Sequence, residues 1–355
     1  MTQLYRPTQA IIDLGAIEKN VTYITEKYQG YQYYMGVVKA DCYGYRGHQV
    51  VDAILKGGAN ALAVSLIEEG LDLRQAYQDI PILLFTPVPK SYLDVCCQHH
   101  LIVTVATYAQ ALHASQIAGL EVMIRVNGGS DILGGPTSFD QFEAMYEILK
   151  HGKCHIKGMY LHSYNAFTKA DTEAEYQKFY ELTQDIDLSQ FEIISIESSL
   201  TLPRYQKLPI ANCCRMGNIM YGIETEDPNL LSTFCLKSQV LSTLVMQKDQ
   251  YIAYDHAYQA TQDNTKIATV PIGFGDGFAK SNIGRNVYIN QRPYPIVAIT
   301  MDITHILVDD DVKENDVVEL IANTHHLDEI ATHTHGATEE PISALNQRVA
   351  RLYIQ

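Results

Sequence analysis

Between about residues 10 and 225, short β-rich runs alternate with stretches of helical period, and this alternation constrains the fold more than any other feature. The intervening stretches carry apolar residues at helical spacing, as at Ile17, Val21, Ile24 and Tyr28. Strands that alternate with helices predict a parallel (β/α)8 barrel of the TIM type, with an open doubly wound sheet as the alternative. The eight runs span residues 33–38, 61–65, 81–85, 101–105, 122–126, 156–161, 193–197 and, more weakly, 210–214.

After about residue 230 the helical rhythm disappears, and short strand-like runs are separated by Gly, Pro, Asn and Asp. This pattern predicts a smaller all-β domain. We therefore expect an N-terminal extension over residues 1–9 that packs on the C-terminal domain, a barrel over residues 10–228 and a β domain over residues 229–355. The expected strands cover residues 240–245, 251–254, 266–271, 286–289, 296–301, 305–308 and 317–321.

Composition narrows the class of protein. With 26 basic and 41 acidic residues the formal net charge is −15, which argues against nucleic acid and anionic membrane surfaces as partners. No apolar run reaches transmembrane length. The seven cysteines form no C-x-x-C motif, which is typical of reduced thiols in a cytoplasmic protein. The histidine pairs lack a third partner at ligand spacing, so we predict solvated loops there and no metal site.

Lys39 stands at the end of the first apolar run, within the string Val-Val-Lys-Ala-Asp-Cys-Tyr-Gly of residues 37–44. At the mouth of a buried strand the charged form of a lysine is disfavoured, so its amine becomes a usable nucleophile. Such a lysine is suited to forming a Schiff base, and in a barrel the C-terminal ends of the strands carry the chemistry. We therefore interpret Lys39 as a functional residue rather than a surface lysine.

The string around Lys39 resembles the cofactor-lysine segment of the alanine racemase family, barrel-type enzymes that depend on pyridoxal phosphate (PLP). Further motifs resemble the family in order along nearly the whole chain. They are Gly-Met-Tyr-Leu-His-Ser at residues 158–163, Cys-Arg-Met-Gly-Asn-Ile-Met-Tyr-Gly at 214–222, Tyr-Ile-Ala-Tyr-Asp-His-Ala-Tyr at 251–258, Pro-Ile-Gly-Phe-Gly-Asp-Gly at 271–277 and Met-Asp at 301–302. The resemblance implies a PLP-dependent racemase.

Racemisation removes the Cα proton from one face of an amino acid and returns one to the other face, so two acid/base groups are needed. The resemblance implies that Lys39 and Tyr254 are these groups. It also implies that His162 bridges the tyrosine and an arginine, and that Arg215 contacts the pyridine nitrogen of the cofactor. An arginine does not readily give up its proton, so that nitrogen would stay unprotonated and side reactions would be suppressed.

The same resemblance implies the remaining binding residues. Contacts to the cofactor phosphate would come from Tyr43, from Ser198 and from the backbone around Gly217 and Asn218. Ser198 is ambiguous with Ser199, because the local string lacks the Asn-Ser pair usual in the family. In the family, the tyrosine and the methionine that matches Met301 cross a dimer interface. A homodimer with composite active sites is therefore expected.

The chain departs from the family pattern where a substrate carboxylate would be held. Ile132 replaces the family arginine there, and Arg125 replaces the lysine that orients this arginine. We expect Arg125 to supply the missing charge, because a hydrogen bond to a charged group contributes about 1.5–3 kcal/mol. Phe274 replaces a tyrosine at the pocket entry, and Gln347 lacks the phosphate contact that a tyrosine gives in some members.

The function expected from these motifs is a PLP-dependent amino-acid racemase that acts on alanine. A racemase for serine or another small amino acid is a competing interpretation, because of the changes at Arg125, Ile132 and Phe274. A PLP-binding protein with little catalysis is the alternative of another class. A decarboxylase of similar architecture fits less well, since the motifs of Tyr254 and Arg215 resemble those of racemases.

Overall fold

The computed structural model describes residues 5–128, 134–163, 168–223 and 227–355. The chain divides into two compact units. One unit consists of residues 21–42 and 47–220 and holds the barrel. The other consists of residues 1–20, 43–46 and 221–355 and holds an open sheet.

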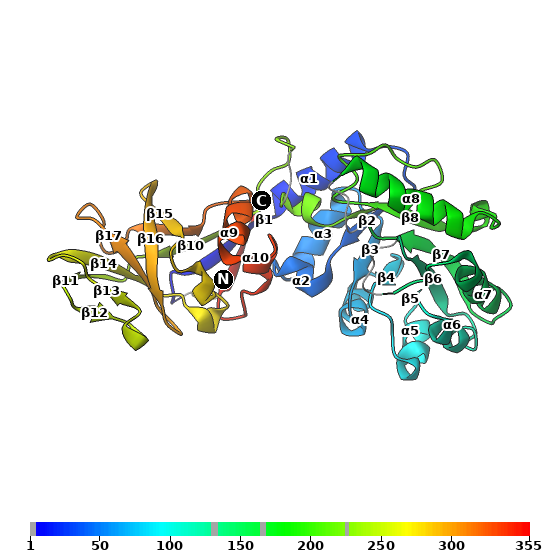
Figure 1. The fold of residues 1–355 in the computed structure, drawn as a ribbon, viewed down its shortest axis with the longest axis horizontal. Helices are drawn as coiled ribbons and strands as arrows, with labels where there is room; N and C mark the ends of the chain where they lie inside the picture. Colours follow the sequence, from blue (N-terminus) through cyan, green and yellow to red (C-terminus); the bar gives the residue numbers. More distant parts are fainter. Residues whose placement is uncertain (1–4, 129–133, 164–167, 224–226) are drawn as a thin grey trace. The chain divides into compact units, whose positions relative to one another are not determined.

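Eight parallel strands close into a barrel in the order β2 to β9, with β9 paired back to β2 (Figure 1). Closure confirms the predicted parallel barrel and excludes the open doubly wound sheet. Strands β7 and β8 approach closely at Gly158, where a Cβ atom would lie 1.7 Å from the carbonyl oxygen of Ile193. The strands are β2 Tyr33–Val37, β3 Ala61–Val64, β4 Ile82–Leu84, β5 Ile102–Val105, β6 Glu121–Val126, β7 His155–Leu161, β8 Ile193–Ser198 and β9 Cys213–Met216.

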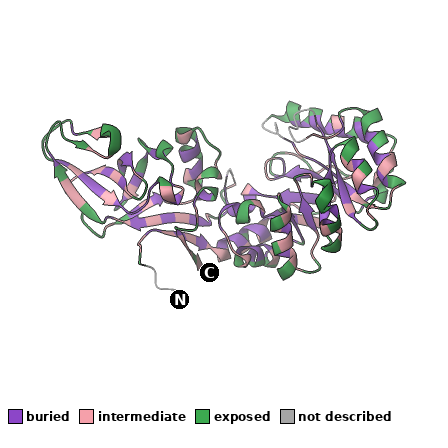
Figure 2. Cartoon of the chain, turned by 90° about the horizontal axis from the view of Figure 1, so that it is seen from below, coloured by how far each residue is buried: buried purple, intermediate pink, exposed green. Residues whose placement is uncertain are grey.

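Helices follow the strands and bury one face each. In α1, Ile17, Val21 and Ile24 are fully buried, as their helical spacing predicts. Figure 2 shows the buried residues concentrated along the strands and the exposed ones along the outer helices. The helices are α1 Leu14–Lys27, the short α2 Lys39–Tyr43, α3 His48–Lys56, α4 Ile67–Ala76, α5 Leu93–Gln98, α6 Tyr108–Ala114, α7 Phe139–Lys150 and α8 Lys169–Thr183.

The second unit is built on a nine-stranded sheet in the order β11-β14-β17-β16-β15-β18-β10-β1-β19, with a separate β12-β13 hairpin. The predicted β-rich domain is therefore confirmed. The strands are β1 Gln9–Asp13, β10 Phe234–Gln239, β11 Ser242–Met246, β12 Tyr251–Ile252, β13 Tyr258–Gln259, β14 Thr265–Val270, β15 Asn286–Ile289, β16 Arg292–Ile299, β17 Thr304–Val308, β18 Val317–Ile321 and β19 Ala350–Ile354.

Strands β1, β10, β13 and β19 were not among the predicted runs, and three further features differ from the sequence prediction. The C-terminal unit is mostly rather than entirely β, because it also contains helices α9 Leu327–Thr334 and α10 Glu340–Ser343. Leu327, Ile330 and Ala331 form the buried face of α9, so the histidines around them lie in helical turns rather than in loops. Strand β9 begins later than the predicted run at 210–214, which places Arg215 inside the strand.

The N-terminal residues contribute to the open sheet. Strand β1 pairs antiparallel with β10 and parallel with β19, and Ala10 and Ile12 point into the core. Before it, the Thr8 hydroxyl donates a hydrogen bond of 2.7 Å to the carbonyl oxygen of Pro271. The Arg6 guanidinium lies 2.9 Å from the carboxylate of Asp276. These contacts attach the N-terminal residues to the open sheet, whereas the extension over residues 1–9 and the domain limits stay predictions.

Candidate active site

Lys39 lies just beyond the end of β2, where the chain enters a left-handed turn. The next four residues, Ala40 to Tyr43, have φ values of 53°, 52°, 54° and 56°. Left-handed backbone costs about 1–2 kcal/mol for each residue with a side chain, and such strain gathers at functional sites. Lys39 itself is half-buried, so the lysine is less enclosed than its place after a buried strand suggested.

Hydrogen bonds hold this strained turn in place. The backbone N–H of Ala40 donates to Oε1 of Glu69 over 2.6 Å. The other carboxylate oxygen, Oε2, accepts from the N–H groups of Ser65 and Leu66 at the start of α4. The N–H of Cys42 donates to the carbonyl oxygen of Val38. One carboxylate therefore ties the segment that carries Lys39 to the end of β3.

Arg215 is buried in β9, and hydrogen bonds from its two terminal nitrogens fix the orientation of its guanidinium. Nη1 donates to the carbonyl oxygen and to the hydroxyl of Ser195 over 3.0 and 2.6 Å. Nη2 donates to the carbonyl oxygen of Leu161 over 2.7 Å. Among the described residues Nε makes no hydrogen bond, so it is the N–H that remains for a ring nitrogen of a cofactor. This donor set fits a pyridine ring.

His162 follows β7 directly and lies in a strongly positive environment. Burial, followed by the positive charges of Arg215, Arg125 and Lys39, lowers the pKa of His162 to about 3. The imidazole is therefore neutral at neutral pH and offers one nitrogen as a donor and the other as an acceptor. The geometry of the two arginines agrees with this influence: both lie over the ring of Tyr160, and Arg215 bonds to the carbonyl oxygen of Leu161, the residue before His162.

Arg125 is buried within the barrel, on β6. Its Nη1 atom donates a hydrogen bond of 3.2 Å to the hydroxyl of Tyr160 on β7. Ile132, the other half of the departure from the family pattern, lies outside the described residues. The expectation that Arg125 supplies a charge in its place stays a prediction.

The turn after β8 meets the residues after β9. Oγ of Ser199 accepts a hydrogen bond of 2.7 Å from the N–H of Gly217. The N–H of Ser198 donates to the hydroxyl of Thr201, and its own side chain is buried beside this turn. Asn218 begins a short 3-10 helix, Asn218–Tyr221. The predicted phosphate residues Ser198, Gly217 and Asn218 are thus neighbours at the C-terminal ends of two adjacent strands.

The remaining predicted residues belong to the unit with the open sheet. The Tyr43 ring is buried and packs on Tyr221, with ring centroids 5.1 Å apart. Tyr254 follows β12 and is 80% exposed. Its neighbours Ala253 and Asp255 have φ values of 64° and 56°, so the tyrosine stands on a strained turn.

Met301 lies just after β16 and is also exposed, as is Phe274. The two loops that carry them are hydrogen-bonded: the N–H of Phe274 donates to the carbonyl oxygen of Thr300, and the N–H of Gly275 to that of Met301. Exposed apolar side chains that form a contiguous patch often mark an interaction surface. The composite site of two subunits stays a prediction that this exposure favours.

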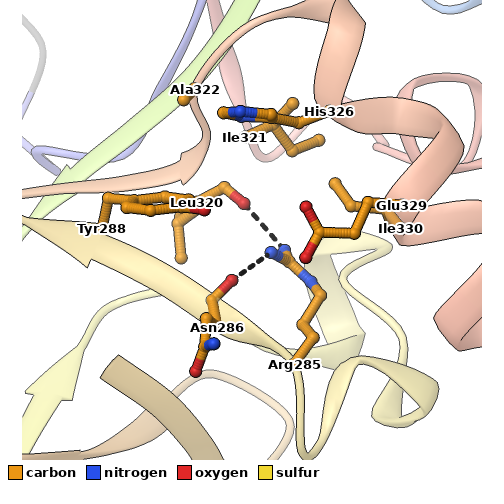
Figure 3. Close-up of a pocket in the computed structure, with 9 residues that line it drawn as sticks. All are labelled: Arg285, Asn286, Tyr288, Leu320, Ile321, Ala322, His326, Glu329 and Ile330. Carbon is orange, nitrogen blue, oxygen red and sulfur yellow. Dashed lines mark hydrogen bonds between the residues drawn. The ribbon is translucent and has the colours of Figure 1, made fainter. Parts of the chain in front are cut away.

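One pocket lies in the unit with the open sheet, and none of its nine lining residues is a predicted site residue (Figure 3). The Arg285 guanidinium at its centre donates to the carbonyl oxygens of Asn286 and Leu320, and the Glu329 carboxylate lies beside it. The rings of Tyr288 and His326 are stacked at its edge. The polar groups of this pocket serve the fold.

The structure describes no cluster of three or more His, Cys, Asp or Glu side chains that could hold a metal ion. Within the described ranges, no helix is long and apolar enough to cross a membrane.

Comparison with known proteins decides the family. Residues 12–225 match the model of the alanine racemase N-terminal domain, and residues 233–353 match that of the C-terminal domain. The chain belongs to the alanine racemase family. It is 29% identical to the alanine racemase of Clostridium kluyveri, over 100% of this chain and 96% of that protein.

Solved structures agree with this assignment. The alanine racemase of Bacillus anthracis with bound L-Ala-P superimposes with a TM-score of 0.90 at 25% identity, covering 100% of this chain and 96% of that one. The Bartonella henselae alanine racemase, which carries covalently bound pyridoxal phosphate, has a TM-score of 0.84 at 21% identity and covers 98% of this chain and 99% of that one. Membership of the alanine racemase family, whose enzymes depend on pyridoxal phosphate, identifies the chain as a racemase with this cofactor.

The fold does not by itself specify the substrate. A histidine racemase from Leuconostoc mesenteroides has a TM-score of 0.84 at 19% identity, covering 99% of each chain. Members of this fold thus act on more than one amino acid.

Sequence reasoning missed Tyr160, which contacts both barrel arginines. A tyrosine within a buried strand is most often part of the core, and the string Met-Tyr-Leu before His162 gives no signal of its own. Only the closed barrel shows that polar side chains from β5, β6 and β9 contact Tyr160. They are Thr104, Arg125 and Arg215.

Proposed function

We propose that this chain interconverts L-alanine and D-alanine by a two-base mechanism, with Lys39 and Tyr254 as the bases. The observation that carries the proposal is the convergence of Lys39, Arg125 and Arg215 on a neutral His162 at the C-terminal end of the barrel. This is the end at which barrel enzymes place their chemistry. A positive site also suits the phosphate of the cofactor and the carboxylate of an amino acid.

When bound, pyridoxal phosphate delocalises the electron pair left on Cα after the proton departs. In our proposal, Nζ of Lys39 takes or returns the proton on one face of the substrate. The Tyr254 hydroxyl does so on the other face, and it comes from a second copy of the chain in a homodimer. A tyrosine with an ordinary pKa near 10 is a weak base at neutral pH. The neutral His162 supports it, because one imidazole nitrogen can accept a hydrogen bond from the phenol.

The other residues bind and orient. Arg215 retains its proton, so it donates from Nε to the ring nitrogen and keeps that nitrogen unprotonated. Ser198, Tyr43 and the backbone at Gly217 and Asn218 hold the phosphate. Arg125 binds the substrate carboxylate, and Met301 lines the pocket. The product would be D-alanine for cell-wall precursors, made in the cytoplasm.

A racemase for serine or another small amino acid is the second candidate. The replacement of a tyrosine by Phe274 removes a hydroxyl from the pocket entry, and Arg125 with Ile132 changes the charge that faces the substrate. A PLP-binding protein with little racemase activity is the candidate of another class. The presence of a β-rich unit with an exposed Tyr254 argues against it.

The test is α-proton exchange in deuterated solvent with purified holoenzyme and a panel of D- and L-amino acids. Exchange and inversion of alanine alone support the proposal, whereas preferred exchange of serine or another amino acid supports the second candidate. Absence of exchange with every amino acid, in a protein whose Lys39 is labelled by PLP after borohydride reduction, supports the third.

A Tyr254→Phe variant tests the second base. It should lower racemisation at least about 100-fold, the usual contribution of a positioned acid/base group, while one enantiomer still exchanges its proton. Tyr251→Phe is the matched control, because Tyr251 is an exposed tyrosine of the same hairpin. Equal activity of both variants would remove Tyr254 from the mechanism.

A further inference from the structure

Tyr160 is a buried residue of β7, two positions before His162. It is 1% exposed and contacts side chains from strands β5, β6 and β9. Its ring is 5.9 Å from that of Phe85, which fixes the ring from the end of β4. The residues that carry the predicted chemistry, Arg125 and Arg215, approach the same ring from β6 and β9.

The hydrogen bonds of Tyr160 have a defined direction. The Thr104 hydroxyl donates to the carbonyl oxygen of Leu84 over 2.7 Å, so its only proton is used. In the 2.9 Å contact between the two hydroxyls, Tyr160 must therefore be the donor. The Tyr160 oxygen then accepts the N–H of Arg125 over 3.2 Å. The chain runs from Arg125 through Tyr160 and Thr104 to a backbone carbonyl, which gives each hydroxyl one fixed orientation.

The ring of Tyr160 also contacts both guanidinium groups. The Cζ atoms of Arg125 and Arg215 lie 5.4 and 5.6 Å from its centroid. A cation within about 6 Å of an aromatic ring is attracted by the negative charge of its π face. The two arginines repel each other, and the charge of Arg125 contributes to the lowered pKa of Arg215 after burial. One uncharged ring therefore contacts two like charges and offsets part of the repulsion between them.

We propose that Tyr160 is a positioning residue that sets the orientation of both arginines, with its hydroxyl acting on Arg125 and its ring acting on both. Arg215 is independently held by Ser195 and Leu161, so it depends on Tyr160 only through the ring. Arg125 contacts both the ring and the hydroxyl of Tyr160. This rests on the proposed function, in which Arg125 binds the substrate carboxylate and Arg215 the cofactor ring.

Two variants separate these effects. Tyr160→Phe keeps the ring and removes the hydroxyl, and Thr104 retains its bond to Leu84. It should raise KM for the amino acid about 10-fold, the lower limit for a lost hydrogen bond to a charged group, with kcat within about 2-fold and the cofactor absorbance unchanged. Tyr160→Leu also removes the ring, so the cofactor absorbance should shift and the Kd of PLP should rise as well.

Tyr146→Phe is the matched control, because Tyr146 on α7 loses a hydroxyl that contacts only Gln190 among the described residues. If both Tyr160 variants show the KM and cofactor absorbance of this control, or lower only the melting temperature, the positioning role is overturned. If Tyr160→Leu does not fold, Tyr160→Phe alone decides. A rise in KM supports the role and an unchanged KM overturns it.

A further measurement separates this proposal from the proposed function. Acetate, a carboxylate without an amine, is titrated into each holoenzyme and followed by the cofactor absorbance. Weaker acetate binding in Tyr160→Phe than in Tyr146→Phe supports the positioning of Arg125 even if the wild-type enzyme racemises no alanine. Equal acetate binding in the two variants overturns it, whether or not alanine is the substrate.

Discussion

The Oγ atom of Ser199 accepts a hydrogen bond of 2.7 Å from the N–H of Gly217, so the serine and the glycine join the ends of β8 and β9. The neighbouring Ser198 hydroxyl makes no hydrogen bond among the described residues. The sequence left the two serines ambiguous. Because Ser199 already bonds to Gly217, we predict that Ser198 rather than Ser199 contacts the cofactor phosphate.

We expect Ser198→Ala to weaken PLP binding about 10-fold or more, because a hydrogen bond to a charged group is lost. Ser199→Ala should change the Kd less but lower the free energy of unfolding by about 1 kcal/mol, the value of an ordinary hydrogen bond. Titration of the apoenzyme with PLP and thermal unfolding measure the two quantities. The reverse order of Kd values would assign the phosphate contact to Ser199.

The sequence was sufficient to predict the place of those site residues that the order of the barrel strands brings together. Lys39, His162 and Arg215 each lie at or near the C-terminal end of a barrel strand, and a parallel barrel necessarily gathers these ends. Residues positioned by long-range pairing could not be predicted in this way. Strand β1 pairs with β10 and β19, which lie far from it in the sequence. No local sequence pattern predicts that pairing. Tyr160 was missed because its role depends on partners from other strands.

Arg6 connects the N-terminal segment to a buried carboxylate. Asp276 is 0% exposed, accepts the N–H of Gly273 and is paired with Arg6 and Arg348. Removing one partner of a buried charge is costly, so Arg6→Ala should lower the free energy of unfolding by about 1.5–3 kcal/mol. Chemical denaturation of the apoenzyme measures this change.

Arg292→Ala is the control for Arg6→Ala. Arg292 is 53% exposed and pairs with Asp309 and Asp311 at the surface. Exposed ion pairs contribute little to stability because water and salt screen them, so this variant should be nearly as stable as the wild type. Equal losses in the two variants would mean that burial of Asp276 does not strengthen the Arg6 contact.

The lowered pKa of His162 makes stability depend on pH. The unfolded chain binds a proton at this histidine below pH 6.5, whereas the folded chain does so only near pH 3. Stability is therefore lost as the pH falls from 6.5 towards 3, by at most about 1.4 kcal/mol per pH unit for one proton. His162→Gln should remove this part of the slope in urea unfolding of the apoenzyme. An unchanged slope would show that His162 is protonated in the folded state.

Glu197 gives the opposite pH dependence. Its side chain is 1% exposed, Oε1 accepts the N–H of Leu208 over 2.9 Å, and Oε2 has no hydrogen-bond partner among the described residues. Burial, the largest influence, raises the pKa of Glu197 from its ordinary value of 4.5. The folded state thus favours the protonated acid, and stability is lost as the pH rises from 4.5 through the raised pKa.

A neutral side chain of the same shape should avoid this loss. Glu197→Gln keeps an oxygen for the N–H of Leu208, so at pH 7–8 we expect a melting temperature higher by about 2 °C or more, and no gain below pH 4.5. Glu192→Gln is the control of opposite sign. Although burial acts to raise it, hydrogen bonds from Lys157 and Tyr33 lower the pKa of Glu192 overall. Glu192→Gln should therefore be less stable than the wild type at neutral pH. If Glu197→Gln also loses stability at pH 8, Glu197 is stable as a carboxylate in the folded protein.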